Sequence, residues 1–362
     1  MRKLSVFLGV VLATIGSAVS AQEVDSTVTM QKSSWGDANK CEITDYIPDV
    51  SLDTKFGYSH GFAENTGRFG GYGLVLDING KISPHFSYSW NHRIASFEGA
   101  DSFGFGNTNW LLLNYEHDYF SISAGKQDMK VGSMEYDMYD LDCYQEMNSY
   151  FWNAVAAWQW GILACAYPTD GQTILLQCTN SPFADISIFS LLAYSLAWQG
   201  EWDCYDSYWS VNLWEYQKGR YVNSLNLGNR FYAGDFTFDL DYSTRCTSLK
   251  DAFTSDFTLT FMPAYEWEWG RAFAKVGYEK VSDCTYACAP DEWDFYGENL
   301  LYGAGLELFP IKSSKDVRIH AIWASNNQKI EGVNPNYINV GLKWKFDITR
   351  GVKTMLDKVR NK

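Results

Sequence analysis

The chain has 362 residues with a formal net charge of −14, and aromatic side chains make up 17% of it, with 15 Trp, 24 Tyr and 22 Phe. This acidic balance excludes a nucleic-acid-binding protein as the default interpretation, because such proteins carry basic patches for phosphate groups. Beyond the first residues, no stretch holds about twenty consecutive apolar residues, so we expect no transmembrane helix. High Gly and low Pro content, with many aromatics, is instead typical of an outer-membrane β-barrel.

The N-terminal residues have the pattern of a secretion signal. Arg2 and Lys3 provide a positive start, residues 4–15 are mostly apolar, and Val19-Ser20-Ala21 is a small-residue cleavage site. We therefore expect residues 1–21 to be a signal peptide that is removed on export. Residues 22–51 are polar and irregular and are expected to form an N-terminal periplasmic lead.

Strand-like segments follow one another from about residue 52 to residue 348, with almost no helical periodicity. We expect this range to form the barrel and residues 349–362 to form a basic C-terminal tail. The sequence predicts about sixteen strands, at residues 53–63, 68–78, 82–95, 105–116, 119–126, 152–167, 172–179, 187–198, 207–217, 221–232, 235–243, 255–265, 270–281, 298–308, 316–325 and 337–348.

The connectors between these segments alternate between short and long. The long ones are expected at 96–104, 127–151, 244–254, 282–297 and 326–336. A membrane barrel with short periplasmic turns and long outer loops has this alternation, and an even strand number places both ends of the barrel on the periplasmic side. Five tight turns are expected, at Asp77-Ile78-Asn79-Gly80, His117-Asp118, Thr169-Asp170-Gly171, Ala233-Gly234-Asp235 and Trp269-Gly270.

Apolar and polar residues alternate within the segments, as in the last one, where Leu342, Trp344 and Phe346 alternate with Lys343 and Lys345. Period two places the apolar set on one face of a strand and the charged set on the other. With aromatics near the strand ends, this favours an apolar face toward lipid and a polar face toward water. The predicted fold is an all-β transmembrane antiparallel β-barrel with an inward-folded loop between strands 5 and 6.

The candidate site is the longest connector, residues 127–151, which joins the fifth and sixth predicted strands. Its tyrosines suggest that it packs against the inner wall and narrows the lumen of a barrel large enough to hold water. Its acids, the predicted pore-constriction residues, are Asp128, Glu135, Asp137, Asp140, Asp142 and Glu146. The predicted bases of the pore wall are Arg93, Arg230, Arg271, Lys275, Arg318, Lys343 and Lys345.

Acids on one side of a water-filled slot and bases on the other would create a transverse field that favours polar solutes. The sequence therefore predicts a passive diffusion channel for small polar solutes and ions, surrounded by outer-membrane lipid. We expect no cofactor and no metal, because the sequence has no phosphate loop, His-Glu-x-x-His, Cys-x-x-Cys or calcium-loop motif.

One segment resembles a known family. The stretch "ISAGKQDMKVGSMEYD", residues 122–137, followed by "DLDCYQEMNSYF", is similar to the phosphate-selective porin O and P family of outer-membrane porins. The matching positions are Ala124, Gly125, Lys126, Gln127, Gly132, Glu135, Tyr136 and Asp137. The resemblance implies a sixteen-stranded porin of the bacterial outer membrane that is often a homotrimer. It does not carry phosphate selectivity across, because the sequence lacks a ladder of arginines.

Three other interpretations stay open at this point. An enzyme within a barrel needs a Ser or Asp paired with His, and none of the five His lies in a nucleophile motif, so we expect no enzyme. A surface-exposed adhesin or structural barrel without transport would use its loops and would show no conductance. A secreted carbohydrate-binding sandwich would share the aromatic content but would need no detergent for extraction.

Overall fold

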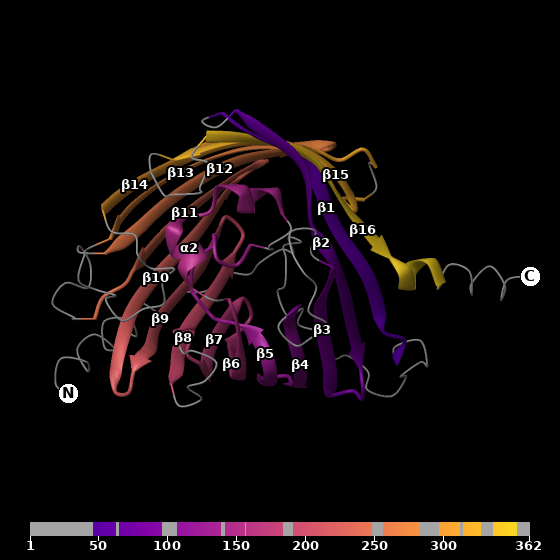
Figure 1. The fold of residues 1–362 in the computed structure, drawn as a ribbon. Helices are drawn as coiled ribbons and strands as arrows, with labels where there is room; N and C mark the ends of the chain where they lie inside the picture. Colours follow the sequence, from indigo (N-terminus) through magenta and orange to yellow (C-terminus); the bar gives the residue numbers. More distant parts are fainter. Residues whose placement is uncertain are drawn as a thin grey trace, which may run out of the picture.

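The computed structural model is a single antiparallel β-sheet that closes into a barrel of sixteen strands, with β1 (Asp49–Gly61) paired to β16 (Asn336–Asp347). The structure describes residues 46–62, 65–95, 107–138, 142–155, 157–183, 191–247, 256–281, 297–311, 314–326 and 336–352. Figure 1 shows the strands enclosing a space that holds a short helix, α2 (Tyr150–Ala154). The predicted fold class is therefore confirmed.

Each predicted strand corresponds to one strand of the barrel, and neighbours in sequence are neighbours in the sheet. The other strands are β2 (Thr66–Lys81), β3 (Phe86–Ala95), β4 (Thr108–His117), β5 (Phe120–Asp128), β6 (Trp158–Thr169), β7 (Gln172–Asn180), β8 (Leu192–Trp202), β9 (Tyr205–Gln217), β10 (Arg220–Ala233), β11 (Phe236–Thr244), β12 (Phe257–Trp267), β13 (Gly270–Val281), β14 (Gly297–Leu308) and β15 (Val317–Asn326).

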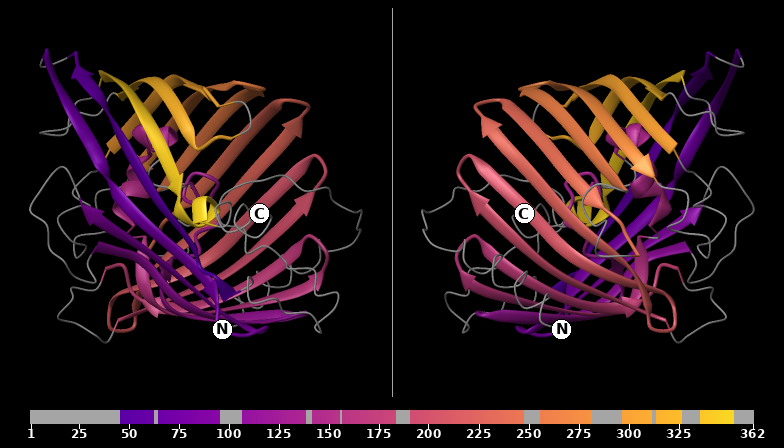
Figure 2. Two further views of the ribbon diagram at one scale, coloured as in Figure 1. Left: turned by 90° about the vertical axis from the view of Figure 1, so that its right-hand side faces the viewer. Right: turned by 90° about the vertical axis from the view of Figure 1, so that its left-hand side faces the viewer.

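The connectors divide the barrel into two ends, which Figure 2 shows from the side. At the turn end, where β1 begins and β16 ends, the connectors lie between strands such as β4–β5, β6–β7 and β10–β11 and have two residues each. At the loop end most connectors are long, except those at 62–65 and 218–219. The predicted alternation thus holds with three exceptions, the short connectors at 62–65 and 218–219 at the loop end and the longer connector at 309–316 at the turn end.

Two local predictions are wrong. The predicted turn at Asp77–Gly80 lies inside β2, because Asp77 and Asn79 face the lumen, where Asn79 Nδ2 donates to Asp77 Oδ1 at 2.9 Å and Ser89 Oγ donates to Asn79 Oδ1. Their short polar side chains give a sequence pattern typical of a turn, but here they form hydrogen bonds on one face of the sheet. The predicted strand at 152–167 begins only at Trp158, since Ser149 Oγ accepts from Trp152 N–H and starts α2.

The distribution of apolar and polar side chains in the barrel is the reverse of that in a soluble protein. Along β14, Leu300, Tyr302 and Leu306 are exposed, whereas Asn299 and Glu307 are buried. On β7, Leu176 is 61% exposed and its neighbour Gln177 is 2% exposed. Apolar side chains therefore cover the outer surface while amides and charges line the interior, as a sheet with lipid outside and a polar lumen requires.

The ends of the barrel are joined by a hydrogen-bonded clasp. Thr349, the first residue of the predicted tail, accepts a hydrogen bond from Val50 N–H at 2.8 Å and donates to the carbonyl of Pro48 at 2.8 Å. The predicted signal peptide and nearly all of the predicted N-terminal lead lie outside the described residues. Within the part of the chain that the structure describes, no helix has the length and hydropathy to cross a membrane.

Candidate pore constriction

Residues 129–157, which we call the constriction loop, connect β5 to β6 and fold into the barrel. The loop contains the 3₁₀ helix η3 (Cys143–Met147) and α2. Figure 1 places α2 inside the curve of the wall, near β10 and β11. The loop forms hydrogen bonds to strands between β7 and β16, so it is packed against the inner wall of the barrel.

The first attachment lies on β7 and β9. Gln177 Oε1 accepts from Lys130 N–H at 2.9 Å, and Asn212 Nδ2 donates to the Lys130 carbonyl at 2.8 Å. Gly132 N–H donates to Ser210 Oγ at 2.8 Å, and a Cβ at Gly132 would lie 2.4 Å from the Ser210 backbone nitrogen. Only glycine permits this approach, because the wall atoms involved are backbone.

The second attachment is the carboxylate of Asp241 on β11. Its oxygens accept hydrogen bonds from Ser133 Oγ at 2.8 Å, from Met134 N–H at 3.0 Å and from Glu135 N–H at 2.7 Å. One wall acid therefore binds three consecutive loop residues. Charge-assisted bonds of this kind are roughly twice as strong as neutral ones, so Asp241 fixes the conformation of the loop at this point.

The third attachment is a buried ion pair between the loop and β13. Glu135 Oε1 lies 2.6 Å from Lys275 Nζ, and the two side chains are 4% and 1% exposed. The same carboxylate accepts from Ser149 N–H at 2.7 Å and from Ser149 Oγ at 2.6 Å. Glu135 thus joins the two halves of the loop to each other and to the wall.

The start of α2 is held by a second residue of β13, the acid Glu279. Glu279 accepts from Tyr150 N–H at 2.9 Å and from Phe151 N–H at 3.1 Å, which are donors that a helix start leaves without partners inside the helix. Thr258 Oγ1 donates to Glu279 at 3.0 Å. Arg245 lies 5.2 Å over the Phe151 ring and donates to Thr258 at 3.2 Å, so it covers the other side of the helix.

The last attachment involves Asp142 at the start of η3. Its Oδ1 accepts from Lys343 Nζ at 2.6 Å and from Arg318 Nη1 at 3.2 Å. Burial alone would raise the pKa of the Asp142 carboxyl, but Lys343 and Arg318 together bring this pKa below its ordinary value. Nearby, Tyr144 OH donates to Glu307 on β14 at 2.6 Å. The loop is therefore tied to the strands beside the closure of the barrel.

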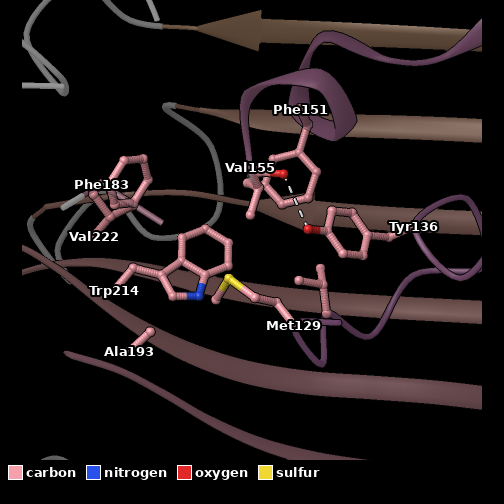
Figure 3. Packing of buried hydrophobic residues seen from close by; sticks show 9 residues of the cluster. Met129, Tyr136, Phe151, Val155, Phe183, Ala193, Trp214 and Val222 are labelled. Atoms are coloured by element: carbon pink, nitrogen blue, oxygen red, sulfur yellow. Dashed lines mark hydrogen bonds between the residues drawn. The ribbon is translucent and has the colours of Figure 1, made fainter. Parts of the chain in front are cut away.

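Apolar packing fills the space between these polar attachments. Figure 3 shows Met129, Tyr136 and Phe151 of the loop against Trp214 of β9 and Val222 of β10. Tyr136 OH donates to the Val155 carbonyl at 3.2 Å, which brings the two ends of the loop together. Loop and wall consequently share a buried core of a kind that soluble domains have at their centre.

The predicted acids and bases meet, but not across a slot. Glu135 pairs with Lys275, and Asp142 pairs with Arg318 and Lys343. The expected transverse field is therefore wrong for these residues, because charges taken out of bulk water require partners in direct contact. The opposite charges compensate each other where the loop meets the wall.

The remaining predicted residues have other surroundings. Arg230 forms two bonds to Asp239 on the adjacent strand, at 2.7 and 2.9 Å, and Arg271 lies 4.6 Å over the Tyr144 ring. Arg93 lies on β3, and Lys345 lies on β16, where its side chain is exposed. Asp140 and the Glu146 side chain lie outside the described residues.

Two of the predicted constriction acids keep contact with water. Asp128, the last residue of β5, is about one-third exposed and pairs with Lys130 of the loop at 2.7 Å. Asp137 is exposed inside the barrel, yet the surrounding wall and loop limit its hydration, and this desolvation raises its pKa to about 7. The charge of Asp137 therefore changes near neutral pH.

Sequence reasoning missed the wall acids that hold the loop, Asp241, Glu279 and Glu307. Alternation places Asp241 and Glu279 on the polar faces of their strands, and a carboxylate among lumen-facing residues is the signal that the sequence offers. Asp241 and Glu279 accept from backbone N–H groups and Glu307 accepts from the Tyr144 hydroxyl, all more than a hundred residues away, which no local pattern reveals. Among the described residues, no group of three or more His, Cys, Asp and Glu is placed to hold a metal ion.

This arrangement, a closed sheet with an outer apolar face and a loop folded into a polar interior, defines the class of porin-like β-barrels. A triple mutant of the Rhodopseudomonas blastica porin covers 83% of this chain and 100% of its own, with a TM-score of 0.57 and 13% identity. A loop-deletion mutant of OmpT, an outer-membrane protein of Vibrio cholerae, covers 83% and 100%, with a TM-score of 0.58 and 11% identity. The structure of OmpT folded in vitro, described as a trimer, covers 83% of this chain and 99% of its own, with a TM-score of 0.55 and 11% identity.

These likenesses show that the chain has the fold of a porin. No protein-family model and no curated protein sequence matches the chain. The resemblance of residues 122–137 to the phosphate-selective porin O and P family thus has no support from a family model.

Proposed function

We propose that this protein is an outer-membrane porin, a passive diffusion channel for small polar solutes and ions, and not an enzyme. The observation that carries the proposal is the inverted barrel with a structured loop in its interior. Exposed Leu, Ile and Phe side chains suit hydrocarbon, and buried Asn, Gln and Ser side chains suit a wet passage.

The test is ion conduction by the purified protein in planar bilayers. The folded full chain, reconstituted from detergent, is expected to give stepwise current increases of uniform size in potassium chloride. Heat-dependent gel migration confirms that the barrel is folded before recording. A folded barrel that inserts into vesicles but passes no current would contradict the proposal.

A structural barrel or adhesin without transport is the second candidate. It is favoured by the extent of burial inside the barrel, where Lys55, Lys275, Glu279 and His320 are all nearly inaccessible. Liposome-swelling assays separate the two candidates, since a blocked barrel admits no solute even when it is correctly inserted.

Selectivity and assembly are finer parts of the proposal. We place the protein in the bacterial outer membrane after removal of residues 1–21, and we expect a homotrimer by analogy with OmpT, whose solved form is described as a trimer. Chemical cross-linking in detergent, followed by mass measurement, tests the assembly. The family resemblance supports a porin but not phosphate selectivity, because the wall lysines that touch the loop, Lys275 and Lys343, are matched by the loop acids Glu135 and Asp142.

A further inference from the structure

The inner wall of β16, β1 and β2, which lie side by side in Figure 1, carries an accessible lysine at its turn end. Lys345 lies on β16 between Trp344 and Phe346, which are 47% and 51% exposed on the outer surface, so its side chain points into the lumen. Lys345 is exposed and lies two residues before the end of β16. Its ammonium is therefore within reach of a solute at the turn-end mouth of the lumen.

Two acids that neighbour Lys345 in the sheet are bound to other bases. Asp53, its register partner on β1, is buried and lies 3.6 Å from Lys343. Asp347, two residues further along β16, lies 3.3 Å from Arg350. Among the ion pairs that the described residues form, none includes Lys345, so no carboxylate in direct contact neutralises its charge.

The nearby negative charge is Asp77 on β2, which is partly exposed and is held by a chain of hydrogen bonds. Trp110 Nε1 donates to Ser89 Oγ at 2.7 Å, and Ser89 Oγ donates to Asn79 Oδ1 at 2.5 Å. Asn79 Nδ2 then donates to Asp77 Oδ1 at 2.9 Å, so every donor of the chain points toward the carboxylate. Because such chains polarise one another, they fix the position of Asp77 and stabilise its negative charge.

One strand separates the two charged residues. Asp77 is opposite Ser51 of β1, and Ser51 is opposite Asp347 of β16, two residues from Lys345. Two strand spacings place the backbones of β2 and β16 about 10 Å apart. Lys345 attracts the Asp77 carboxylate across this distance without forming an ion pair with it. Ser51 between them is small and partly exposed, so a small solute can lie between the two charges.

This arrangement favours solutes that carry both charges. An anion bound to Lys345 alone is repelled by Asp77, and a cation bound to Asp77 alone is repelled by Lys345. A zwitterion avoids both penalties, because its ammonium donates to the carboxylate while its own carboxylate accepts from the lysine. The exposed amide of Asn79 beside Asp77 can bond a peptide group in addition.

We propose that Lys345 and Asp77 form a binding site for zwitterionic solutes, of the class of free amino acids and short peptides, at the turn-end mouth of the lumen. This inference rests on the proposed channel function and specifies its substrate class. The α-ammonium of the solute lies against Asp77, and its carboxylate lies against Lys345.

The test is saturation-transfer NMR on the detergent-solubilised barrel, which detects weak binding and does not require conduction. Glycylglycine at neutral pH is expected to give a signal that saturates with concentration. N-acetylglycine lacks the ammonium and glycinamide lacks the carboxylate, so each is expected to bind about fivefold more weakly. Equal binding of the three probes would overturn the site.

Two variants remove one charge each. Lys345→Met keeps the length of the side chain, and Asp77→Asn keeps an oxygen that accepts from Asn79. Each is expected to weaken glycylglycine binding by about fivefold. Lys345→Met should also abolish the preference for glycylglycine over glycinamide, and Asp77→Asn the preference over N-acetylglycine. Heat-dependent gel migration checks that each variant is folded, and Lys345→Met, at an exposed position, tests the site even if Asp77→Asn does not fold.

The matched control is Lys218→Met, which removes the same charge from an exposed residue of the 218–219 connector at the loop end. It should leave the binding of all three probes unchanged. If Lys218→Met and Lys345→Met bind glycylglycine equally, the site is refuted.

Conduction in planar bilayers separates this site from the channel proposal. A barrel that conducts but binds the three probes equally keeps the channel function and loses the site. A barrel that prefers glycylglycine but passes no current keeps the site and loses the transport function.

Discussion

At the residue scale, the constriction loop shows how a charged side chain can be buried in a barrel wall. Lys275 pairs with one carboxylate oxygen of Glu135, and the hydroxyl of Ser149 donates a hydrogen bond to the other. Both oxygens of the buried carboxylate therefore have partners. Removing one member of such a pair lowers stability far more than replacing both members with uncharged residues, because the remaining charge is buried without water or a counter-charge.

We expect Glu135→Gln to lower the free energy of unfolding by about 3–5 kcal/mol, because it leaves the Lys275 ammonium buried without a counter-charge. Denaturant unfolding in lipid vesicles measures this. Asp128→Asn is the control: its pair with Lys130 is partly exposed and should be worth less than about 1 kcal/mol. The double variant Glu135→Gln with Lys275→Met should recover most of the loss; an equally unstable double variant would refute this explanation.

Asp137 should make ion selectivity depend on pH. Its carboxyl is desolvated and lies near Asp128 and Asp241, while Lys130 and Arg230 act in the opposite direction, and its pKa is about 7. Below this pKa the group is neutral and above it negative, so preference for potassium over chloride should rise between pH 6 and pH 8 with a midpoint near the pKa. Reversal potentials in a potassium chloride gradient measure this preference.

Asp137→Asn should abolish the dependence and hold the preference at its acidic value, with conductance otherwise retained. A pH profile that survives this substitution would assign the titration to another group.

At the element scale, the seating of the loop depends on close backbone contacts. Gly132→Ala would place a Cβ 2.4 Å from Ser210 N and 2.5 Å from Trp209 C, so the loop must move away from β9. We expect a loss of roughly 1–3 kcal/mol in stability and noisier open-channel current, as the loop samples new positions. Gly70→Ala is the control, since a Cβ there meets nothing within 4 Å. Equal behaviour of the two variants would show that the loop does not limit the passage.

The strands could be predicted from sequence because alternation is a local property. Phe236, Phe238 and Leu240 opposite Asp239 and Asp241 already define the two faces of β11. The partner of Asp241 could not be predicted, because Glu135 lies 106 positions away and their meeting depends on the path of the whole loop. The turn at Asp77–Gly80 failed for a related reason: Asp and Asn are common both in turns and on a wet strand face.

At the scale of the whole molecule, the outer apolar surface predicts a different response to the same substitution on the two faces of one strand. Leu176→Arg places a charge in hydrocarbon and should cost about 2–4 kcal/mol of folding energy in lipid vesicles. Thr173→Arg, three residues away on the inner face near the turn end, should cost little. Equal costs would indicate that the outer surface of β7 does not contact lipid.

The pairing of β1 with β16 has a consequence for biogenesis. The first strand, β1, and the last, β16, close the barrel by pairing with each other. Thr349 holds this junction by its hydrogen bond to Val50, and Asp142 of the constriction loop binds Lys343 of β16. The barrel therefore cannot close its sheet or finish seating its interior loop until β16 is present. Such long-range closure is slow, and until then the unpaired margins of the first and last strands are open to aggregation. The cell must keep this polypeptide shielded until its two extremes meet.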